Sequence, residues 1–194
     1  CTGHLVLEMP EWRPPPSLLR FLDSGEPPVY VGFGSVPVRD PAGEVARWAE
    51  AARRAGTRAL LYPAAGFTDW DRDYGEHVHL VRFTPHDWLL PRTAAAVHHG
   101  GAGTTHGALA AGVPQGVIPF SLDQPYFARR VAALGLGPGG LDPGRTDVEG
   151  PTRILTDLTR GERAEGYRRR AREAARAVER ENGARTAARI LLGS

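Results

Sequence analysis

Short apolar runs alternate with amphipathic segments along most of the chain. The first run, VYVGF at residues 29–33, stops at Gly34 and Ser35, as a buried strand and its exit loop would. Further short strands are predicted at 57–63, 77–83, 94–99 and 115–120. Helices are predicted at 42–55, 103–112 and 123–135, with a helical turn at 85–92 and only helix after about residue 147. This alternation predicts an α/β fold, a Rossmann-like parallel sheet with helices on both faces.

The first 26 residues differ from the rest of the chain. They are rich in proline through Pro16 and then turn apolar, which predicts an interdomain linker that runs into a short entry helix. We expect residues 27–194 to form one domain, because domains usually have about 100–200 residues. The start at Cys1, without a signal or targeting sequence, suggests a piece of a longer protein.

Composition narrows the class of protein. Hydrophobic residues make up 41% of the chain, and no apolar run approaches the roughly 20 residues that a membrane span needs. A single cysteine excludes a disulfide framework and favours a reducing, cytoplasmic location. The net charge of +2 gives no reason to expect nucleic acid as a partner. Arginines cluster in residues 166–191 with interleaved glutamates, which favours a solvated helix face over a nucleic-acid or lipid patch.

The sequence HHGGAGTTHG at residues 98–107 joins a predicted strand to a predicted helix. Ligands of open parallel sheets bind at the carboxyl ends of the strands, where this turn lies. Glycines let a ligand approach the main chain, and the helix N-terminus favours an anion. The residues expected to contribute are Gly100, Gly101 and Gly103 by their bare backbone and His99, Thr104 and Thr105 by their side-chain donors. The turn therefore predicts a diphosphate site, although close packing of helix on strand would also explain the glycines.

Other chemistries fit the turn less well. Its GxGxxxG spacing matches neither the dinucleotide fingerprint nor the P-loop, which also needs a lysine. His98 and His99 would point to opposite faces of a strand, which disfavours a shared metal ion. The sequence GFGSVP lacks the GxSxG pattern of a hydrolase nucleophile.

Four strings together, PPVYVGFGS, FTPHDWLLP, HHGGAGTT and PFSLDQ, resemble the donor-binding half of nucleotide-sugar glycosyltransferases with the GT-B fold. The likeness is to sterol glucosyltransferases and to bacterial glycosyltransferases of antibiotic biosynthesis, and it covers about residues 27–137. It implies the C-terminal half of a GT-B fold and an inverting transfer of a hexose. The implied donor is a nucleoside diphosphate sugar, with UDP-glucose favoured, and the implied acceptor is a hydroxyl of a lipophilic molecule. No metal or other cofactor is implied.

The resemblance also implies roles for individual residues. His99 would stabilise the leaving diphosphate, the 83–86 segment would frame the nucleobase, and the acid–amide pair 123–124 would hold the sugar hydroxyls. The implied donor-binding residues are Ser35, Phe83, Thr84, Pro85, His86, His99, Gly101, Ala102, Gly103, Thr104, Thr105, Asp123 and Gln124. The sequence departs from the family at two positions. Many relatives have tryptophan in place of Phe83, and Gly107 stands where plant relatives place an acid that holds the ribose.

Alternatives remain open at this point. Thr84 with Asp87, and Ser121 with Gln124, also fit capping boxes that need no ligand, and His86 could serve only to pack its turn. The resemblance places the catalytic base in a separate N-terminal acceptor domain, so no catalytic base is expected in this chain. Two alternative functions remain. The chain could be an auxiliary module that binds a nucleotide sugar without transferring it, or it could be half of a nucleotide-sugar epimerase or of a lipid-linked sugar transferase.

Overall fold

Five parallel strands form a single sheet in the computed structural model, which describes residues 2, 3, 5, 9, 11–34, 38–140, 142 and 147–193. The strands are β1 (Val29–Gly32), β2 (Ala59–Tyr62), β3 (Val78–Leu80), β4 (Ala95–His98) and β5 (Gln115–Val117). They are ordered β3-β2-β1-β4-β5. Val29 pairs in register with both Ala59 and Ala95, so the carboxyl ends of the central strands lie at one edge. The strand order reverses between β1 and β4, which is where sheets of this kind bind ligands.

Helices cover both faces of the sheet. They are α1 (Pro16–Asp23), α2 (Pro41–Ala55), α3 (His86–Leu89), α4 (Ala102–Ala111), α5 (Gln124–Ala133), α6 (Glu149–Thr159), α7 (Gly161–Glu181) and α8 (Gly183–Leu192), with a 3₁₀ turn η1 (Leu90–Arg92). On one face, Val29 and Val31 pack with Trp48 of α2 and Leu155 of α6. On the other, Tyr30 and Leu60 pack with α1, α3 and α4. Alternate residues of each strand therefore face two separate apolar layers, as a sheet buried on both sides requires.

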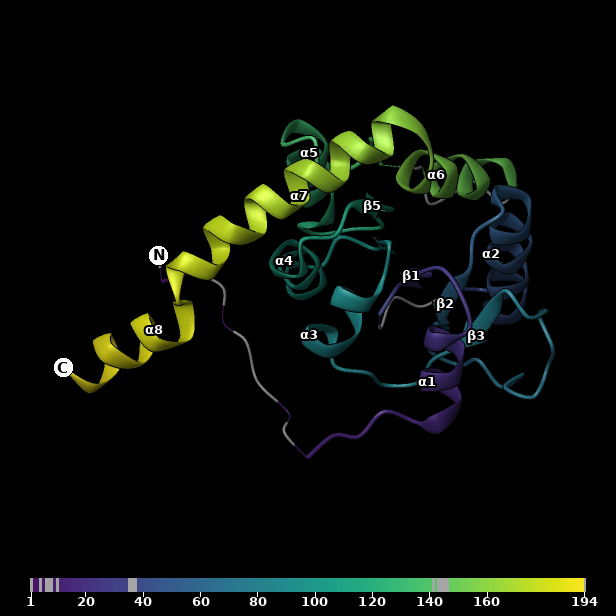
Figure 1. The fold of residues 1–194 in the computed structure, drawn as a ribbon, viewed down its shortest axis with the longest axis horizontal. Coiled ribbons are helices and arrows are strands. Elements are labelled where there is room, and N and C mark those ends of the chain that lie inside the picture. Colours follow the sequence, from purple (N-terminus) through teal and green to yellow (C-terminus); the bar gives the residue numbers. More distant parts are fainter. Residues whose placement is uncertain are drawn as a thin grey trace.

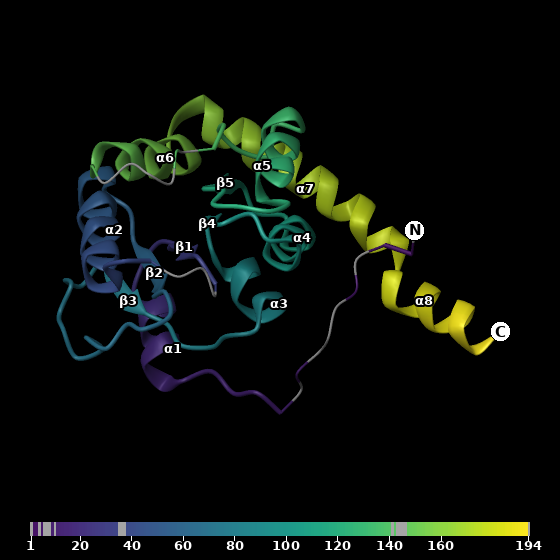
Figure 2. The ribbon, with the colours of Figure 1, turned by 180° about the vertical axis from the view of Figure 1, so that it is seen from behind.

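The C-terminal helices lie at one side of the sheet and extend beyond it. Helices α5 and α7 lie side by side near β5, and α8 projects away from the rest of the molecule (Figures 1 and 2). Only Ala164 and Ala171 of α7 are buried, so most of its arginine-rich surface faces solvent. That exposure agrees with a solvated helix face, although no ion pair joins two residues of α7 in the described part of the chain.

The predicted fold class is confirmed, and each predicted element is present within a few residues of its expected position. The strands are shorter than predicted. In particular, β5 ends at Val117, and residues 118–120 leave the sheet toward the start of α5. None of the helices in the described ranges combines the length and the apolar character needed to cross a membrane.

Candidate functional site

Three loops meet at the carboxyl edge of the sheet, one after each of β1, β4 and β5. A Cβ atom placed on Gly34, after β1, would lie 3.0 Å from Cε1 of His99, after β4. A Cβ atom on Gly100 would lie 3.4 Å from Cα of Gln124, which begins α5. The fold thus brings the glycine-rich turn and the 123–124 pair together, as the sequence predicts. Ser35 lies outside the described residues.

The His98 side chain fixes the backbone at the start of the glycine-rich turn. It is fully buried at the end of β4, where its Nδ1 accepts a hydrogen bond of 3.0 Å from the Gly100 N–H. Its Nε2 lies 2.9 Å from Oε1 of Gln115, so the ring proton sits on Nε2 and donates to that amide oxygen. Burial lowers the pKa of His98 to about 4, which keeps the ring neutral near pH 7. His98 therefore has a positioning role and is not available to a ligand.

His99, in contrast, is half-buried at the edge of the site. Its imidazole fits between Gly34 and Gly101, since a Cβ atom on either would collide with the ring. Its Nδ1 is buried and makes no hydrogen bond of good geometry with a described residue. Burial lowers the pKa of His99, while the Gly32 main chain and the Asp123 carboxylate act in the opposite direction. The ring is thus placed beside the start of α4, where an imidazole N–H could donate to an anion.

The space available for a side chain differs at the three glycines of the turn. Gly100 has φ +89°, and a Cβ atom there would lie 2.7 Å from Cγ1 of Val117. Gly101 makes room for the His99 ring. A Cβ atom on Gly103 would have no neighbour within 4 Å beyond the backbone of its own helix, and Gly103 lines an open cavity. Packing therefore explains Gly100 and Gly101, whereas Gly103 borders open space in the cavity.

The first turn of α4 presents unpaired main-chain donors. Its N-cap is Gly101, and no side chain caps it, so the amides of Ala102, Gly103 and Thr104 lack intrahelical acceptors. The Thr105 hydroxyl has a partner within its own helix. It donates 2.9 Å to the Gly101 carbonyl oxygen, because a threonine in a helix readily bonds to the carbonyl four residues earlier. Thr104 is the threonine whose side chain borders the cavity.

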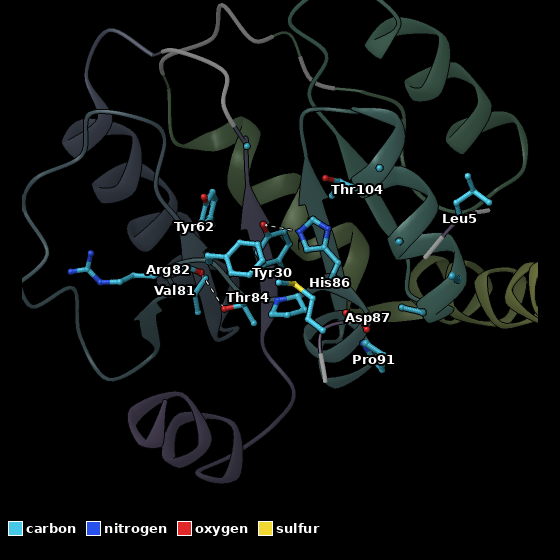
Figure 3. Close-up of a pocket in the computed structure, with 18 residues that line it drawn as sticks. Leu5, Tyr30, Tyr62, Val81, Arg82, Thr84, His86, Asp87, Pro91 and Thr104 are labelled. Atoms are coloured by element: carbon cyan, nitrogen blue, oxygen red, sulfur yellow. Dashed lines mark hydrogen bonds between the residues drawn. The ribbon is translucent and has the colours of Figure 1, made fainter. Parts of the chain in front are cut away.

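A cavity of about 740 Å³ runs from the start of α4 to the segment between β3 and α3. Gly103 and Thr104 line one side of it, and residues 83–87 line another (Figure 3). The Phe83 side chain is 61% exposed, which leaves its ring available for stacking. The volume falls within the range of small-molecule sites, about 300–1,000 Å³.

The capping alternatives for the predicted site residues have different outcomes. The Thr84 hydroxyl donates 3.1 Å to the Arg82 carbonyl oxygen, and α3 begins without a side-chain cap, so Thr84 and Asp87 form no capping box. Gln124 does cap its turn, because its Oε1 accepts from the amides of Phe120, at 2.7 Å, and Ser121, at 3.1 Å. This cap uses the Oε1 atom of Gln124 and not its amide N–H₂ group. The neighbouring Asp123 is exposed beside His99.

Sequence reasoning overlooked Tyr30, which it treated as part of an apolar strand. The Tyr30 side chain lines the cavity, and its hydroxyl lies 3.4 Å from Nε2 of His86 (Figure 3). The available signal was Gly32, two residues along the same strand face, where a side chain would overlap the Tyr30 phenol. Across the described ranges, no group of three or more His, Cys, Asp or Glu side chains gathers closely enough to hold a metal ion.

Comparison with known proteins places this geometry in context. The family described as "Erythromycin biosynthesis protein CIII-like, C-terminal domain" matches residues 70–187. Over 193 residues, the chain is 42% identical to vancomycin aglycone glucosyltransferase of Amycolatopsis orientalis, and the match covers 98% of the chain and 44% of that protein. It is 41% identical over 127 residues to a sterol 3-beta-glucosyltransferase of Arabidopsis thaliana, covering 66% of the chain and 20% of that protein.

Solved structures agree on the fold. The calicheamicin glycosyltransferase CalG4 superposes with a TM-score of 0.75 at 24% identity, over 96% of this chain and 45% of CalG4. A variant of Os79 from O. sativa, solved in complex with UDP, superposes with a TM-score of 0.73 at 24% identity, over 90% of this chain and 41% of Os79. The chain thus spans less than half the length of each of these proteins.

Proposed function

Because the chain belongs to the family of erythromycin biosynthesis protein CIII-like C-terminal domains, we propose that it is the donor-binding part of an inverting glycosyltransferase. The donor is a nucleoside diphosphate hexose, with UDP-glucose favoured, and the acceptor is a hydroxyl of a lipophilic molecule such as a sterol or a polyketide. The names of two relatives support glucose as the sugar, one acting on a sterol and one on an antibiotic aglycone. The Os79 complex with UDP supports the nucleotide.

The cavity carries this proposal. It joins a helix N-terminus, which favours the negative charge of a diphosphate, to an exposed aromatic residue and a short irregular segment suited to a nucleobase. A nucleoside diphosphate has its charge at one end and its aromatic ring at the other. The 123–124 pair lies close to His99 and to the glycine-rich turn, which supports a role for it in holding the sugar.

In the proposed reaction, the acceptor oxygen forms a bond to the anomeric carbon while the bond from that carbon to the diphosphate oxygen breaks. Attack from the face opposite the diphosphate inverts the anomeric configuration. Negative charge grows on the departing diphosphate, and the α4 amides and the His99 imidazole would stabilise it. The proton of the acceptor hydroxyl goes to a base in the N-terminal domain that the full protein would supply.

Gly103→Ala tests the donor site most directly. The variant keeps the α4 amide but adds a methyl group where nothing beyond the helix's own backbone lies within 4 Å, so it should fold normally and obstruct a diphosphate. We expect calorimetric titration with UDP and UDP-glucose to show affinity lower by about tenfold or more, equivalent to about 1.4 kcal/mol. The matched control is Gly166→Ala in α7, which has the same open surroundings and lies away from the cavity.

If Gly103→Ala bound UDP as tightly as wild type, the proposed diphosphate position would be contradicted. It would also be contradicted if the Gly166→Ala control weakened UDP binding as much as Gly103→Ala does. Titration with dTDP-glucose and UDP-N-acetylglucosamine separates the donor classes, since preference for the acetylated sugar would favour the epimerase or lipid-linked transferase alternative. We also expect the chain alone to bind the donor but to transfer little sugar, and ready glycosylation of an acceptor would refute that expectation.

A further inference from the structure

A second cavity, the amino-edge cavity, lies at the edge of the sheet where the strands begin. Its wall includes Pro27, Ala94 and Pro114, which precede β1, β4 and β5. Helix α4 joins the two edges of the sheet, because its first turn borders the cavity described above and its C-cap residue, Gly112, borders this one. The amino-edge cavity has a volume of about 600 Å³, within the range of small-molecule sites.

The charged residues of the amino-edge cavity are mostly arginines. Three arginines and one glutamate line it, namely Arg160, Arg168, Arg172 and Glu26. Arg160 lies at the junction of α6 and α7, and the other two arginines are four residues apart on α7, so they share one face of that helix. Arg168 and Arg172 also border a groove of about 440 Å³ along α7, so the groove continues from the cavity.

Helix C-termini hold two of these arginines in place. Nη2 of Arg160 donates 2.9 Å to the carbonyl oxygen of Gly56, the C-cap of α2. Nη2 of Arg168 donates 2.6 Å to the carbonyl oxygen of Thr159, the last residue of α6. The partial negative charge at a helix C-terminus favours such contacts. A guanidinium has five N–H donors, so each group is fixed and still has donors to spare.

Arg172 is not explained by capping. Its side chain makes no hydrogen bond or ion pair with a described residue, although its Cα would lie 3.6 Å from a Cβ atom on Gly112. The facing acids are Glu26, in the cavity wall, and Glu165 and Glu173, which border the groove. The C-termini of α2, α4 and α6 each offset about half a charge. The remaining positive charge is therefore small and is concentrated at Arg172.

We propose that the amino-edge cavity binds a small anion that carries two or more phosphate or carboxylate groups. Arg172 is its main contact, and Arg160 and Arg168 supply donors that the helix ends have already fixed. The planar fork of a guanidinium matches a phosphate or a carboxylate with two parallel hydrogen bonds. More than one anionic group is needed to reach arginines from two segments of the chain. None of the residues assigned to the donor takes part, so this inference does not depend on the proposed function.

Calorimetric titration with inorganic pyrophosphate and with citrate tests the proposal, at low ionic strength so that salt does not screen the contact. Saturating UDP is present, because Ala111 borders both cavities and pyrophosphate could otherwise enter the first one. We expect wild type to bind at least one of the two anions saturably, and the tighter one identifies phosphate or carboxylate as the preferred group. Arg172→Gln should lower that affinity about tenfold, because a charged donor is lost. Arg172→Lys, which keeps the charge but not the fork, should restore only part of it.

Arg163→Gln is the matched control, because it makes the same change of charge on α7 and borders neither cavity. It should bind the anion as wild type does, and so should Gly103→Ala. The proposal would be overturned if neither anion bound saturably, or if Arg163→Gln weakened binding as much as Arg172→Gln. Loss of anion binding in Gly103→Ala but not in Arg172→Gln would overturn it too, by assigning the anion to the first cavity. UDP binding should be the same in Arg172→Gln and wild type, and a loss there would contradict two separate sites.

Discussion

The buried, neutral state of His98 predicts a specific loss of stability in mild acid. His98 is fully buried, and its two ring nitrogens are committed to the Gly100 amide and to Gln115. Burial is the largest cause of its lowered pKa, the hydrogen bond with Gln115 opposes that shift, and the nearby His99 and His86 add to it. Protonation would place a second N–H against the Gly100 amide, so the folded state resists it.

The magnitude follows from the two pKa values. The folded value is about 4, and the unfolded value is the ordinary one near 6.5. As the pH falls below 6.5, the unfolded chain takes up a proton at this residue and the folded chain does not. The free energy of unfolding therefore falls, by about 2 kcal/mol between pH 7 and pH 5. No further loss from His98 occurs below about pH 3, where both states are protonated.

Urea denaturation followed by circular dichroism at pH 7 and pH 5 measures this effect. His79, His86 and His99 also have lowered pKa values, so the change must be compared with that of His98→Gln. The variant should be less stable than wild type at pH 7 but should lose about 2 kcal/mol less on going to pH 5. The same loss in both proteins, or a His98 resonance that titrates near pH 6.5 in NMR spectra, would refute the assignment.

Three further substitutions have distinct expected outcomes. Leu122→Gly should raise the melting temperature by about 2 °C in a thermal scan, because Leu122 has φ +57° and is 92% exposed; a lower melting temperature would mean that the leucine makes stabilising contacts. Gly107→Ala should stabilise α4 by about 0.5–1 kcal/mol in urea denaturation, since its Cβ would meet only ordinary contacts, and yet weaken UDP binding. Stability and affinity that rise together would show that the cavity at this point is not used. Gly100→Ala should cost about 2–3 kcal/mol of unfolding free energy, because φ is +89° and Val117 blocks the side chain; a loss under about 1 kcal/mol would contradict that geometry.

The sequence alone was sufficient for the fold class, because strand and helix periodicities are local properties. The apolar run at 29–33, the alternation after it and the glycines that end helices predicted a parallel sheet covered on both faces. Each predicted strand was too long at its carboxyl end, notably at 115–120. Residues just past the strand ends can remain apolar because they still pack into the core, as the buried Ile118 does.

The sequence also identified the segments of the candidate site, since a glycine-rich turn after a strand is a local pattern. It could not assign a separate cause to each glycine. Gly101 leaves room for the His99 ring, whereas Gly103 borders the cavity. This difference depends on how the loops and helices pack in space. It could not show that the Thr105 hydroxyl is bonded within its own helix, or that Gln124 caps its turn through Oε1.

The amino-acid sequence by itself determined which helices and strands form, and which strand ends carry polar residues and glycines. Only the tertiary structure decided which side chains face one another across those ends. Tyr30 looks like core in a strand pattern, and it becomes the partner of His86 because β1 lies beside the loop that follows β3 and enters α3. Hydrogen bonding and burial act over a few ångströms in space, whereas these two residues are 56 positions apart in the sequence.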